Sequence, residues 1–408
     1  MKILLIGHAC GPNRGSEPGS TWNLARELAH SNDVWVLTHP QHRQEIEEDC
    51  VRNPNPRLHF AWLELTRFDP WKPATGQHGI RLHYLMWLPK AAKLARELHN
   101  KIHFDIVHHV SLSSISAPSS FWQLDAPFVW GPVGGGQCAP SAFRSYFRGT
   151  WMKESLRSLR VKLLPYSKHL RRTVAAAQMV LASNAETLKV LQLAGAKRTK
   201  LFLDSGVNDA DLAREVSSRN PNSRITLLWA GRLEQIKALP LLLHAMGALP
   251  GQPVTLVVAG DGPEREACEK LANELGLSEA VTFVGHLKQS ALSDLMLRSD
   301  AFVFTSLRDS FGSVVLEALA RSLPVVTFQH QGVGTFLPPE ACIKLRVSSP
   351  KETIQDLAAA IQTISENPAA LRPMRAAALQ FARAQTWARR AQAMTVVYQE
   401  AVHAYRAV

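Results

Sequence analysis

Short apolar runs alternate along the chain with longer segments whose apolar residues recur every three or four positions. In the first half we predict strands over Lys2–Gly7, Asp33–Thr38, Leu58–Leu65, Phe104–Val110, Pro127–Trp130 and Met179–Ser183. In the second half we predict them over Ile225–Ala230, Val254–Ala259, Val281–Val284, Ala301–Thr305 and Pro324–Thr327. Helical spacing fills many intervals, such as Ser20–Ser31 and Leu82–His99. Nearly continuous apolar strands alternating with helices are typical of parallel sheets covered on both faces, so the pattern predicts an α/β fold.

The strand and helix pattern restarts once, which indicates two domains. A chain of 408 residues exceeds one ordinary domain, and two domains of about 200 residues are expected. Residues 208–223 lack periodicity and include a polar run at 217–223, so we predict a linker there. We place a first domain at residues 1–207 and a second at 224–385. Residues 386–408 have the spacing of one helix, which can complete the first domain, although the sequence alone leaves its partner open.

Apolar runs and cysteines bear on the compartment. No run approaches the ~20 apolar residues that a membrane span needs, and the run after Lys2 is too short for a signal peptide. The five cysteines show no CxxC spacing, so we expect reduced thiols and no structural zinc. A cytoplasmic location is the expectation.

The net charge of +12 is concentrated in the first half. Residues 1–205 hold 26 Lys and Arg against 15 Asp and Glu, whereas residues 206–408 hold 20 against 19. Residues 144–172 alone carry nine basic side chains and one acidic one. Such a patch attracts phosphate-rich partners, namely anionic lipid, a lipid-diphosphate acceptor or nucleic acid. We predict an acceptor or membrane surface that includes Arg144, Arg148, Lys153, Arg157 and Arg160.

Two carboxylates, Asp309 and Glu317, stand eight positions apart around a Phe-Gly turn. The apolar run Ala301–Thr305 precedes them, and the helical pattern Ser313–Ser322 follows. They therefore lie where a strand ends and a helix begins. In an open α/β sheet this is where ligands bind, because helix N-terminal amides and loop groups converge there.

Two cations, Arg232 and Lys237, follow the first strand of the second half. Arginine offers a planar fork of donors and lysine a point charge. Fixed cations of this kind can stabilise the negative charge that grows on a departing diphosphate. A solvated pair at a helix start is the alternative interpretation.

These segments resemble the retaining GT-B glycosyltransferases of family 4, also called glycosyl transferases group 1. The Asp309–Glu317 stretch is similar to their Glu-x7-Glu motif with Asp in the first place, and residues 231–237 to their Gly-Arg-Leu-x-x-x-Lys-Gly segment. The resemblance implies two facing Rossmann-like domains with an interdomain cleft. It also implies retaining transfer of a hexose from a UDP- or GDP-linked sugar to a hydroxyl, without a metal or another cofactor. At Ala238 the family usually has Gly, and because alanine continues a helix well we expect no consequence.

The resemblance also implies roles for individual residues. Glu317 would bind the ribose hydroxyls and Asp309 the donor sugar. Base binding would fall to His286 and Leu287, whereas the turn at Gly260–Pro263 is interpreted as structural. Contacts with the sugar and diphosphate would come from the amides of Phe311, Gly312, Ser313 and Val314.

In the first half, a glycine-rich loop with Gly15 and Ser16 follows the first strand and opens a helix. It is not GxGxxG, but its amides can still approach the donor. In the resembled family a histidine commonly follows a nearby strand and contacts the donor sugar. The corresponding stretch here is Phe128–Gly136, and it contains no histidine. Either His109 or its neighbour His108 supplies that contact, or the amides of Gly134–Gly136 do. His109 is our candidate catalytic residue; a hydrogen-bonded structural histidine at the strand end is the alternative.

The basic first half and the habit of the family suggest a lipid-linked saccharide acceptor in bacterial exopolysaccharide or lipopolysaccharide assembly. The enzyme would then work in the cytoplasm, with peripheral contact at the inner face of an anionic membrane. A nucleotide-sugar epimerase of the same architecture is one alternative, and a non-catalytic polyanion-binding protein is another. We expect no nucleic-acid partner, because the basic residues accompany no recognised nucleic-acid motif.

Overall fold

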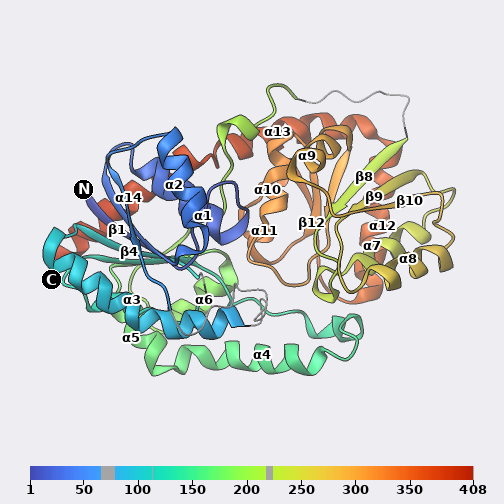
Figure 1. Cartoon of the computed structure of the whole chain (residues 1–408). Helices are drawn as coiled ribbons and strands as arrows, with labels where there is room; N and C mark the ends of the chain where they lie inside the picture. The colour runs from blue at the N-terminus through green and yellow to red at the C-terminus, as the bar shows by residue number, and fades with distance from the viewer. Residues whose placement is uncertain (66–78, 113, 217–223, 408) are drawn as a thin grey trace. The chain divides into compact units, whose positions relative to one another are not determined.

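The computed structural model describes residues 1–65, 79–112, 114–216 and 224–407, which form two compact units (Figure 1). The first unit comprises Met1–Gly136, Arg160–Gly206 and Trp387–Val408. The second comprises Gln137–Leu159 and Val207–Thr386. Each unit is built on one parallel sheet, so the predicted α/β fold with two parallel-sheet domains is confirmed.

The first unit has a seven-stranded sheet in the order β3-β2-β1-β4-β5-β6-β7. Its strands are β1 (Lys2–Gly7), β2 (Asp33–Thr38), β3 (Leu58–Trp62), β4 (Ile106–Ser111), β5 (Phe128–Val133), β6 (Met179–Ala182) and β7 (Thr199–Leu201). Its helices are α1 (Ser16–Leu28), α2 (Arg43–Arg52), α3 (Ile80–Ile102), α5 (Lys168–Ala176), α6 (Ala185–Leu193) and α14 (Trp387–Arg406). Helix α4 (Trp151–Leu163) spans the division between the units.

The C-terminal helix α14 packs inside the first unit. Met394 and Tyr398 are fully buried there, in the same cluster as Ile3 of β1 and Trp22 of α1. The Tyr398 hydroxyl also lies 2.7 Å from Nδ1 of His108 on β4. The last helix of the chain therefore belongs to the core of the first unit.

The second unit has a six-stranded sheet in the order β10-β9-β8-β11-β12-β13, the 3-2-1-4-5-6 order of a Rossmann-type sheet. Its strands are β8 (Ile225–Ala230), β9 (Val254–Ala259), β10 (Val281–Gly285), β11 (Ala301–Phe304), β12 (Val325–Phe328) and β13 (Cys342–Leu345). Its helices are α7 (Leu239–Gly247), α8 (Arg265–Glu274), α9 (Gln289–Arg298), α10 (Ser313–Ala320), α11 (Gln331–Phe336), α12 (Pro350–Glu366) and α13 (Leu371–Arg383).

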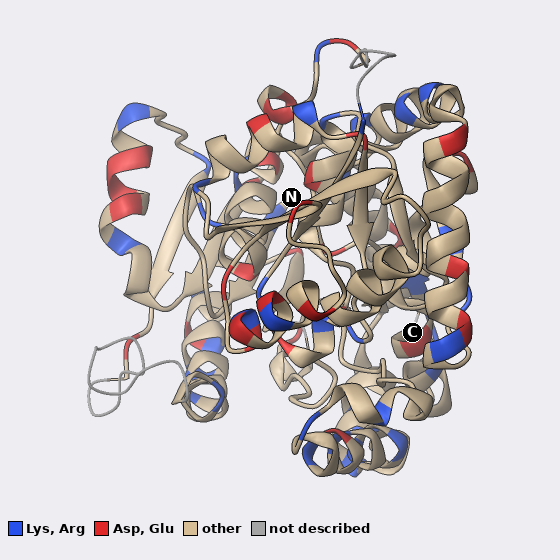
Figure 2. Cartoon of the chain, turned by 90° about the vertical axis from the view of Figure 1, so that its right-hand side faces the viewer, with Lys and Arg blue, Asp and Glu red and all other residues tan. Residues whose placement is uncertain are grey.

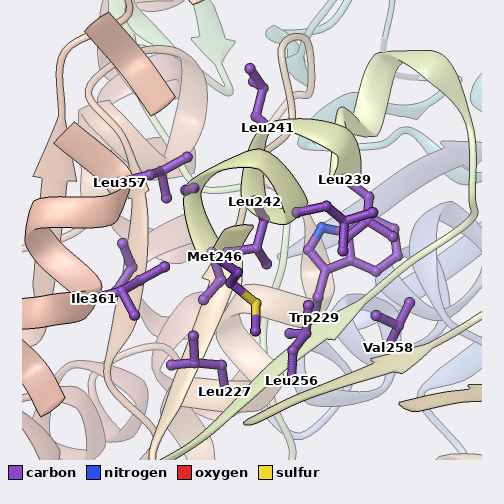
Figure 3. Close-up of a cluster of buried hydrophobic side chains, with 14 of the residues drawn as sticks. Leu227, Trp229, Leu239, Leu241, Leu242, Met246, Leu256, Val258, Leu357 and Ile361 are labelled. Carbon is purple, nitrogen blue, oxygen red and sulfur yellow. The ribbon is translucent and has the colours of Figure 1, made fainter. Parts of the chain in front are cut away.

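The core of the second unit is layered around α7 (Figure 3). Leu242 and Met246 of this helix lie close to Leu227 on β8, and Ile361 of α12 closes the same cluster. All four side chains are at most 2% exposed, so α7 is held between the sheet and α12. This packing fixes the position of α7 and therefore of the loop that leads into it from β8. That loop carries both cations of the candidate site, Arg232 and Lys237.

Residues 137–159 pack with the second unit, whereas the sequence analysis placed them in the first domain. The reason is apolar burial: Ala139, Phe143 and Phe147 are at most 7% exposed and belong to the core cluster of α7 and β8. The predicted linker is attached to the second unit as well. The Ala213 amide donates to the Ala320 carbonyl at 2.7 Å, and Asp211 pairs with Arg321 at 3.1 Å. Residues 217–223 lie outside the described part of the chain.

Candidate functional site

A pocket of about 560 Å³ opens at the carboxyl ends of β8, β9 and β10. Its lining includes five residues that the sequence analysis selected for donor binding: Arg232, His286, Leu287, Val314 and Glu317. They come from three separate segments, namely the loop after β8, the loop after β10, and α10. The carboxyl ends of parallel strands share one edge of a sheet, and this explains why residues so far apart in sequence meet there.

Glycines bring the strand-end loops close enough to form this pocket. Gly260 has φ of 137°, and a Cβ atom there would lie 1.9 Å from the carbonyl oxygen of Gly231. Gly262 would meet Leu233 in the same way, at 2.4 Å. The turn after β9 is therefore structural, as predicted, but Gly260 and Gly262 also line the pocket. Their position directly after a predicted strand was the signal for this second role.

Glu317 projects from the second turn of α10 into the pocket. Burial raises the pKa of its carboxyl above the ordinary glutamate value. The neighbouring Arg321 guanidinium opposes this shift, and the Asp211 carboxylate adds to it. The carboxylate is thus held where it is poorly hydrated, which favours a ligand able to donate hydrogen bonds to it.

Arg232 lies at the open side of the same pocket. Its side chain is 65% exposed, and its Nε is 2.9 Å from Oε1 of Glu234. An ion pair this exposed contributes little to stability. The guanidinium can therefore exchange Glu234 for an anionic ligand at small cost.

Lys237 and Asp309, which the sequence analysis gave separate roles, form an ion pair. Their side chains are only 24% and 21% exposed. The Asp309 carboxylate also accepts from the Ser310 amide at 2.9 Å, and the Asp309 amide donates to Oε1 of Gln331 at 2.6 Å. An anionic ligand that binds Lys237 would compete with Asp309 for the ammonium.

The core of the second unit positions the Lys237 loop. Nε1 of Trp229 on β8 donates to Oγ1 of Thr305 at 3.1 Å, and that hydroxyl donates to the Lys237 carbonyl at 2.7 Å. The Leu307 amide donates to the Ile236 carbonyl at 2.8 Å. The two loops that carry Lys237 and Asp309 are therefore tied to each other and to a buried indole.

The sequence-based expectation that Ala238 has no consequence because alanine continues a helix rested on a wrong reason. Ala238 does not continue a helix: it has φ of 48° and ψ of 41°, a left-handed conformation, directly before α7. An L-residue pays a steric cost in this region, and glycine does not. The strain at Ala238 explains why glycine is favoured at this position.

The segment before α10 brings backbone amides to the site. The Phe311 side chain is fully buried and packs edge-to-face on Phe336, so only its backbone is available to a ligand. Gly312 has φ of 91°, and a Cβ there would lie 2.8 Å from the Phe304 ring. The first N–H groups of a helix have no partner within it, and those of Ser313 and Val314 stand at the start of α10.

Gly15 and Ser16 lie in the first unit and are exposed: Gly15 is the N-cap residue of α1, and Ser16 is its first residue. A Cβ at Gly15 would meet nothing within 4 Å, and Ser16 has φ of 57°. The loop is turned tightly, because a Cβ at Gly19 would lie 1.9 Å from the Arg14 carbonyl oxygen. A donor-binding role for Gly15 and Ser16 stays a prediction.

His109 does not reach an accessible surface. It is 1% exposed, its Nε2 lies 3.0 Å from the Tyr84 hydroxyl and from the Ser111 carbonyl, and its ring packs on Phe121. Burial lowers the pKa of His109 to about 3, so the ring is neutral at physiological pH. The structure favours the alternative interpretation, a hydrogen-bonded structural histidine in the core of the first unit.

Four of the five predicted acceptor-surface cations, Arg144, Arg148, Lys153 and Arg160, are exposed. Arg157 differs because it faces inward on α4. Its guanidinium donates to the Gln137 carbonyl at 2.8 Å and pairs with the buried Glu154 at 3.6 Å. Glu154 also pairs with Arg308 at 3.0 Å, so Arg157 belongs to a structural cluster rather than to the open surface.

Within the ranges given above, no three or more His, Cys, Asp and Glu side chains are arranged to hold a metal ion. None of the helices in those ranges combines the length and apolar character needed to cross a bilayer.

Residues 210–384 match the family model of glycosyl transferases group 1. Glycogen synthase of Mycobacterium tuberculosis is 35% identical over 171 residues, which is 40% of each chain. The lipopolysaccharide core biosynthesis glycosyltransferase LpsE of Rhizobium meliloti is 36% identical over 117 residues, 29% of this chain and 33% of LpsE. Among solved structures, Anabaena HepE in complex with UDP superposes with a TM-score of 0.63 at 18% identity, covering 98% of this chain and 100% of HepE.

The sequence matches thus span less than half of these two curated relatives, whereas the structural match spans the whole chain. The matched segment contains the pocket lining and the Lys237–Asp309 pair. The chain has the GT-B fold, and its residues 210–384 match the glycosyl transferases group 1 family.

Proposed function

We propose that this protein is a retaining, metal-independent glycosyltransferase. It moves a hexose from a nucleoside-diphosphate sugar to a hydroxyl of a saccharide acceptor, in the manner of family 4. The observation that carries the proposal is the strand-end pocket of the second unit. There Arg232 and Glu317 share one lining, and Lys237, from the same loop as Arg232, pairs with Asp309.

The nucleotide occupies the pocket between the β8, β9 and β10 ends. A carboxylate accepts two hydrogen bonds, which suits Glu317 to the two hydroxyls of a ribose. The base lies against His286 and Leu287, which line the pocket beyond β10. We propose a UDP- or GDP-linked donor, and the UDP complex of the structural relative HepE supports a nucleotide-sugar donor.

The diphosphate is neutralised by protein cations instead of a metal ion. Arg232 and Lys237 both exchange an existing carboxylate partner for the phosphates. The amides at the start of α10 add donors aimed at the same region. These groups stabilise the charge that develops on the leaving diphosphate in the transition state.

Transfer takes place on one face of the donor sugar. The bond from the anomeric carbon to the diphosphate oxygen breaks, the bond to the acceptor oxygen forms, and the acceptor proton passes to the departing phosphate. Asp309, released from Lys237, binds a sugar hydroxyl. Positioning and electrostatics suffice for this chemistry, so no protein nucleophile is invoked.

The proposed acceptor is a lipid-linked saccharide of bacterial exopolysaccharide or lipopolysaccharide assembly. The basic surface that includes Arg144, Arg148, Lys153 and Arg160 supports it, because cations attract a lipid diphosphate and anionic headgroups. The partial match to LpsE, a lipopolysaccharide core glycosyltransferase, supports it further. The enzyme is proposed to act in the cytoplasm, in peripheral contact with the inner face of the cell membrane.

Calorimetric titration with UDP-, GDP-, ADP- and dTDP-sugars, without metal, tests the donor site. One donor should bind the wild type, and Glu317→Gln should lose that binding while the exposed Glu279→Gln keeps it. Absence of binding to every donor, or equal binding by both variants, would contradict the assignment. If the protein converted the donor to a sugar epimer in the absence of an acceptor, the epimerase alternative would be favoured.

A further inference from the structure

Helix α4 exposes a stripe of apolar side chains. Met152, Leu156, Leu159 and Leu163 are 84%, 49%, 53% and 56% exposed. Their spacing of four, three and four residues places them on one side of the helix; at 100° per residue they fall within about 60° of arc. Tyr166, just beyond α4, is 76% exposed. Exposing such an apolar row to water does not stabilise a monomeric protein. The stripe is therefore expected to be covered by a binding partner.

The stripe points directly away from the protein. Glu154 and Val161, the buried residues of α4, lie about 180° around the helix from the centre of the stripe at 100° per residue. Trp151 and Arg157 are partly buried near that same inner side. The helix therefore has an inner face that packs and an outer face that is apolar.

Cations flank the apolar stripe on both sides. Lys153 and Arg160 lie along one edge and Lys162 along the other, and all three are exposed. Glu154, the one acidic residue of α4, is buried on the inner face. In Figure 2 basic and acidic positions are intermixed along many helices. The outer face of α4 carries cations and no acidic residue.

We propose that α4 docks on an anionic phospholipid bilayer, with the Met152–Leu163 stripe inserted at the level of the headgroups. An apolar row between two cationic edges matches the boundary between acyl chains and lipid phosphates. A second copy of the chain fits less well, since like-charged edges would face each other. Nucleic acid would pair with the cations but would leave the leucines in water.

The part of the docking helix before residue 160 belongs to the unit that holds the donor pocket. Glu154 on its inner face pairs with Arg308, the neighbour of Asp309, and Nε2 of Gln235 donates to the Arg148 carbonyl just before the helix at 3.1 Å. The biological meaning of docking rests on the proposed transfer to a lipid-linked acceptor. Binding to the bilayer is measured separately from nucleotide-sugar binding, so the two proposals fail independently.

The test is cosedimentation of the full chain with vesicles. Wild-type protein should bind vesicles of phosphatidylcholine and phosphatidylglycerol in equal amounts, and bind pure phosphatidylcholine weakly. Leu156→Gln with Leu159→Gln should weaken binding by at least about tenfold, because less apolar surface is inserted. Lys153→Gln with Arg160→Gln should weaken it by about tenfold or more on the anionic vesicles only.

Matched substitutions elsewhere provide the controls. Leu193→Gln replaces a leucine that is 64% exposed on α6, and Arg298→Gln with Lys351→Gln removes two exposed cations of the second unit. All of these controls should bind vesicles as the wild type does, and the stripe variant should still bind the nucleotide-sugar. If the stripe variant bound vesicles as the wild type does, binding would depend on charge alone and the proposed insertion would be overturned. Concentration-dependent dimers lost in that variant, without vesicle binding, would assign the stripe to a second copy instead.

Discussion

At the scale of single residues, the candidate site combines a carboxylate whose environment disfavours its charge with a partly buried ion pair. Burial raises the pKa of Glu317, and Lys237 pairs with Asp309 in a partly buried position. Buried carboxylates and ion pairs of this kind are common at sites where a bound ligand supplies further hydrogen bonds or charge. They also make the residues testable, because function and stability should respond in opposite directions.

Replacing Glu317 with glutamine should stabilise the fold near neutral pH. Burial raises the pKa of Glu317 in the folded state above the ordinary value of about 4.3. Its ionisation therefore favours the unfolded chain, and wild-type stability falls as pH rises through the raised pKa. Glutamine does not titrate, so Glu317→Gln should show a higher free energy of unfolding near neutral pH. The gain should vanish below about pH 4.3.

Urea denaturation of Glu317→Gln and Glu279→Gln at the two pH values measures this effect. Glu279 is exposed, so its substitution should change the free energy of unfolding little at either pH. A Glu317→Gln variant that is less stable than the wild type at neutral pH would contradict the prediction. In that case Arg321 would outweigh burial at this site.

Removing either cation should lower turnover strongly. Arg232→Ala or Lys237→Ala deletes a group that stabilises the leaving diphosphate, and loss of one such donor typically costs roughly 10²–10³ in rate. Steady-state rates with the donor found by calorimetry measure the effect. Arg372→Ala, an exposed arginine of α13, is the control and should leave turnover unchanged. Near-normal rates for both cation variants would remove the diphosphate assignment.

At the scale of elements, most strands follow from the sequence because they are short, apolar and bounded by turn residues. The predictions for Lys2–Gly7, Ile225–Ala230 and Val254–Ala259 coincide with β1, β8 and β9. The edge strands β7 and β13 were missed. Their residues are mostly half-buried, so they lack the continuous apolar run that marks a central strand.

The turn after β9 should tolerate no side chain at Gly260. In Gly260→Ala the new Cβ would lie 1.9 Å from a backbone oxygen, at a φ that L-residues rarely adopt. We expect a loss of more than about 2 kcal/mol in the free energy of unfolding. Gly231→Ala, at the neighbouring end of β8, places a Cβ that meets only the Trp229 ring, at 3.6 Å, and should cost far less. Equal losses in thermal or urea unfolding would contradict this view of the turn.

At the scale of the whole molecule, the chain passes between the two units four times, because residues 137–159 and 387–408 pack away from their neighbours in sequence. The predicted boundary near residue 207 is close to where the chain enters the long segment of the second unit, Val207–Thr386. The excursion at 137–159 was not anticipated, since the sequence does not show which of two cores the apolar residues Ala139, Phe143 and Phe147 will join. Buried apolar surface, not sequence proximity, decides which unit a segment joins.

Helix α14 should be essential to the first unit. Met394→Ala deletes a side chain that is fully buried among β1, α1 and β4, and should cost about 2–5 kcal/mol in the free energy of unfolding. Val396→Ala, two residues along the same helix but 51% exposed, should cost little. Hydrogen exchange of the β1 and β4 amides reports on the first unit directly. Protection unchanged by Met394→Ala would mean that α14 is dispensable for this core.

The sequence by itself determined the α/β class, the central strands, and the spacing that puts Arg232 and His286 after strand ends and Glu317 in the helix after β11. These are local properties: apolar periodicity defines strands, and the carboxyl ends of parallel strands necessarily share an edge. Only the tertiary structure decided the pairing of Lys237 with Asp309, the burial of His109, and the packing of α14 in the first unit. Each depends on contacts between residues far apart in the chain, and these are chosen by how side chains fill a common core.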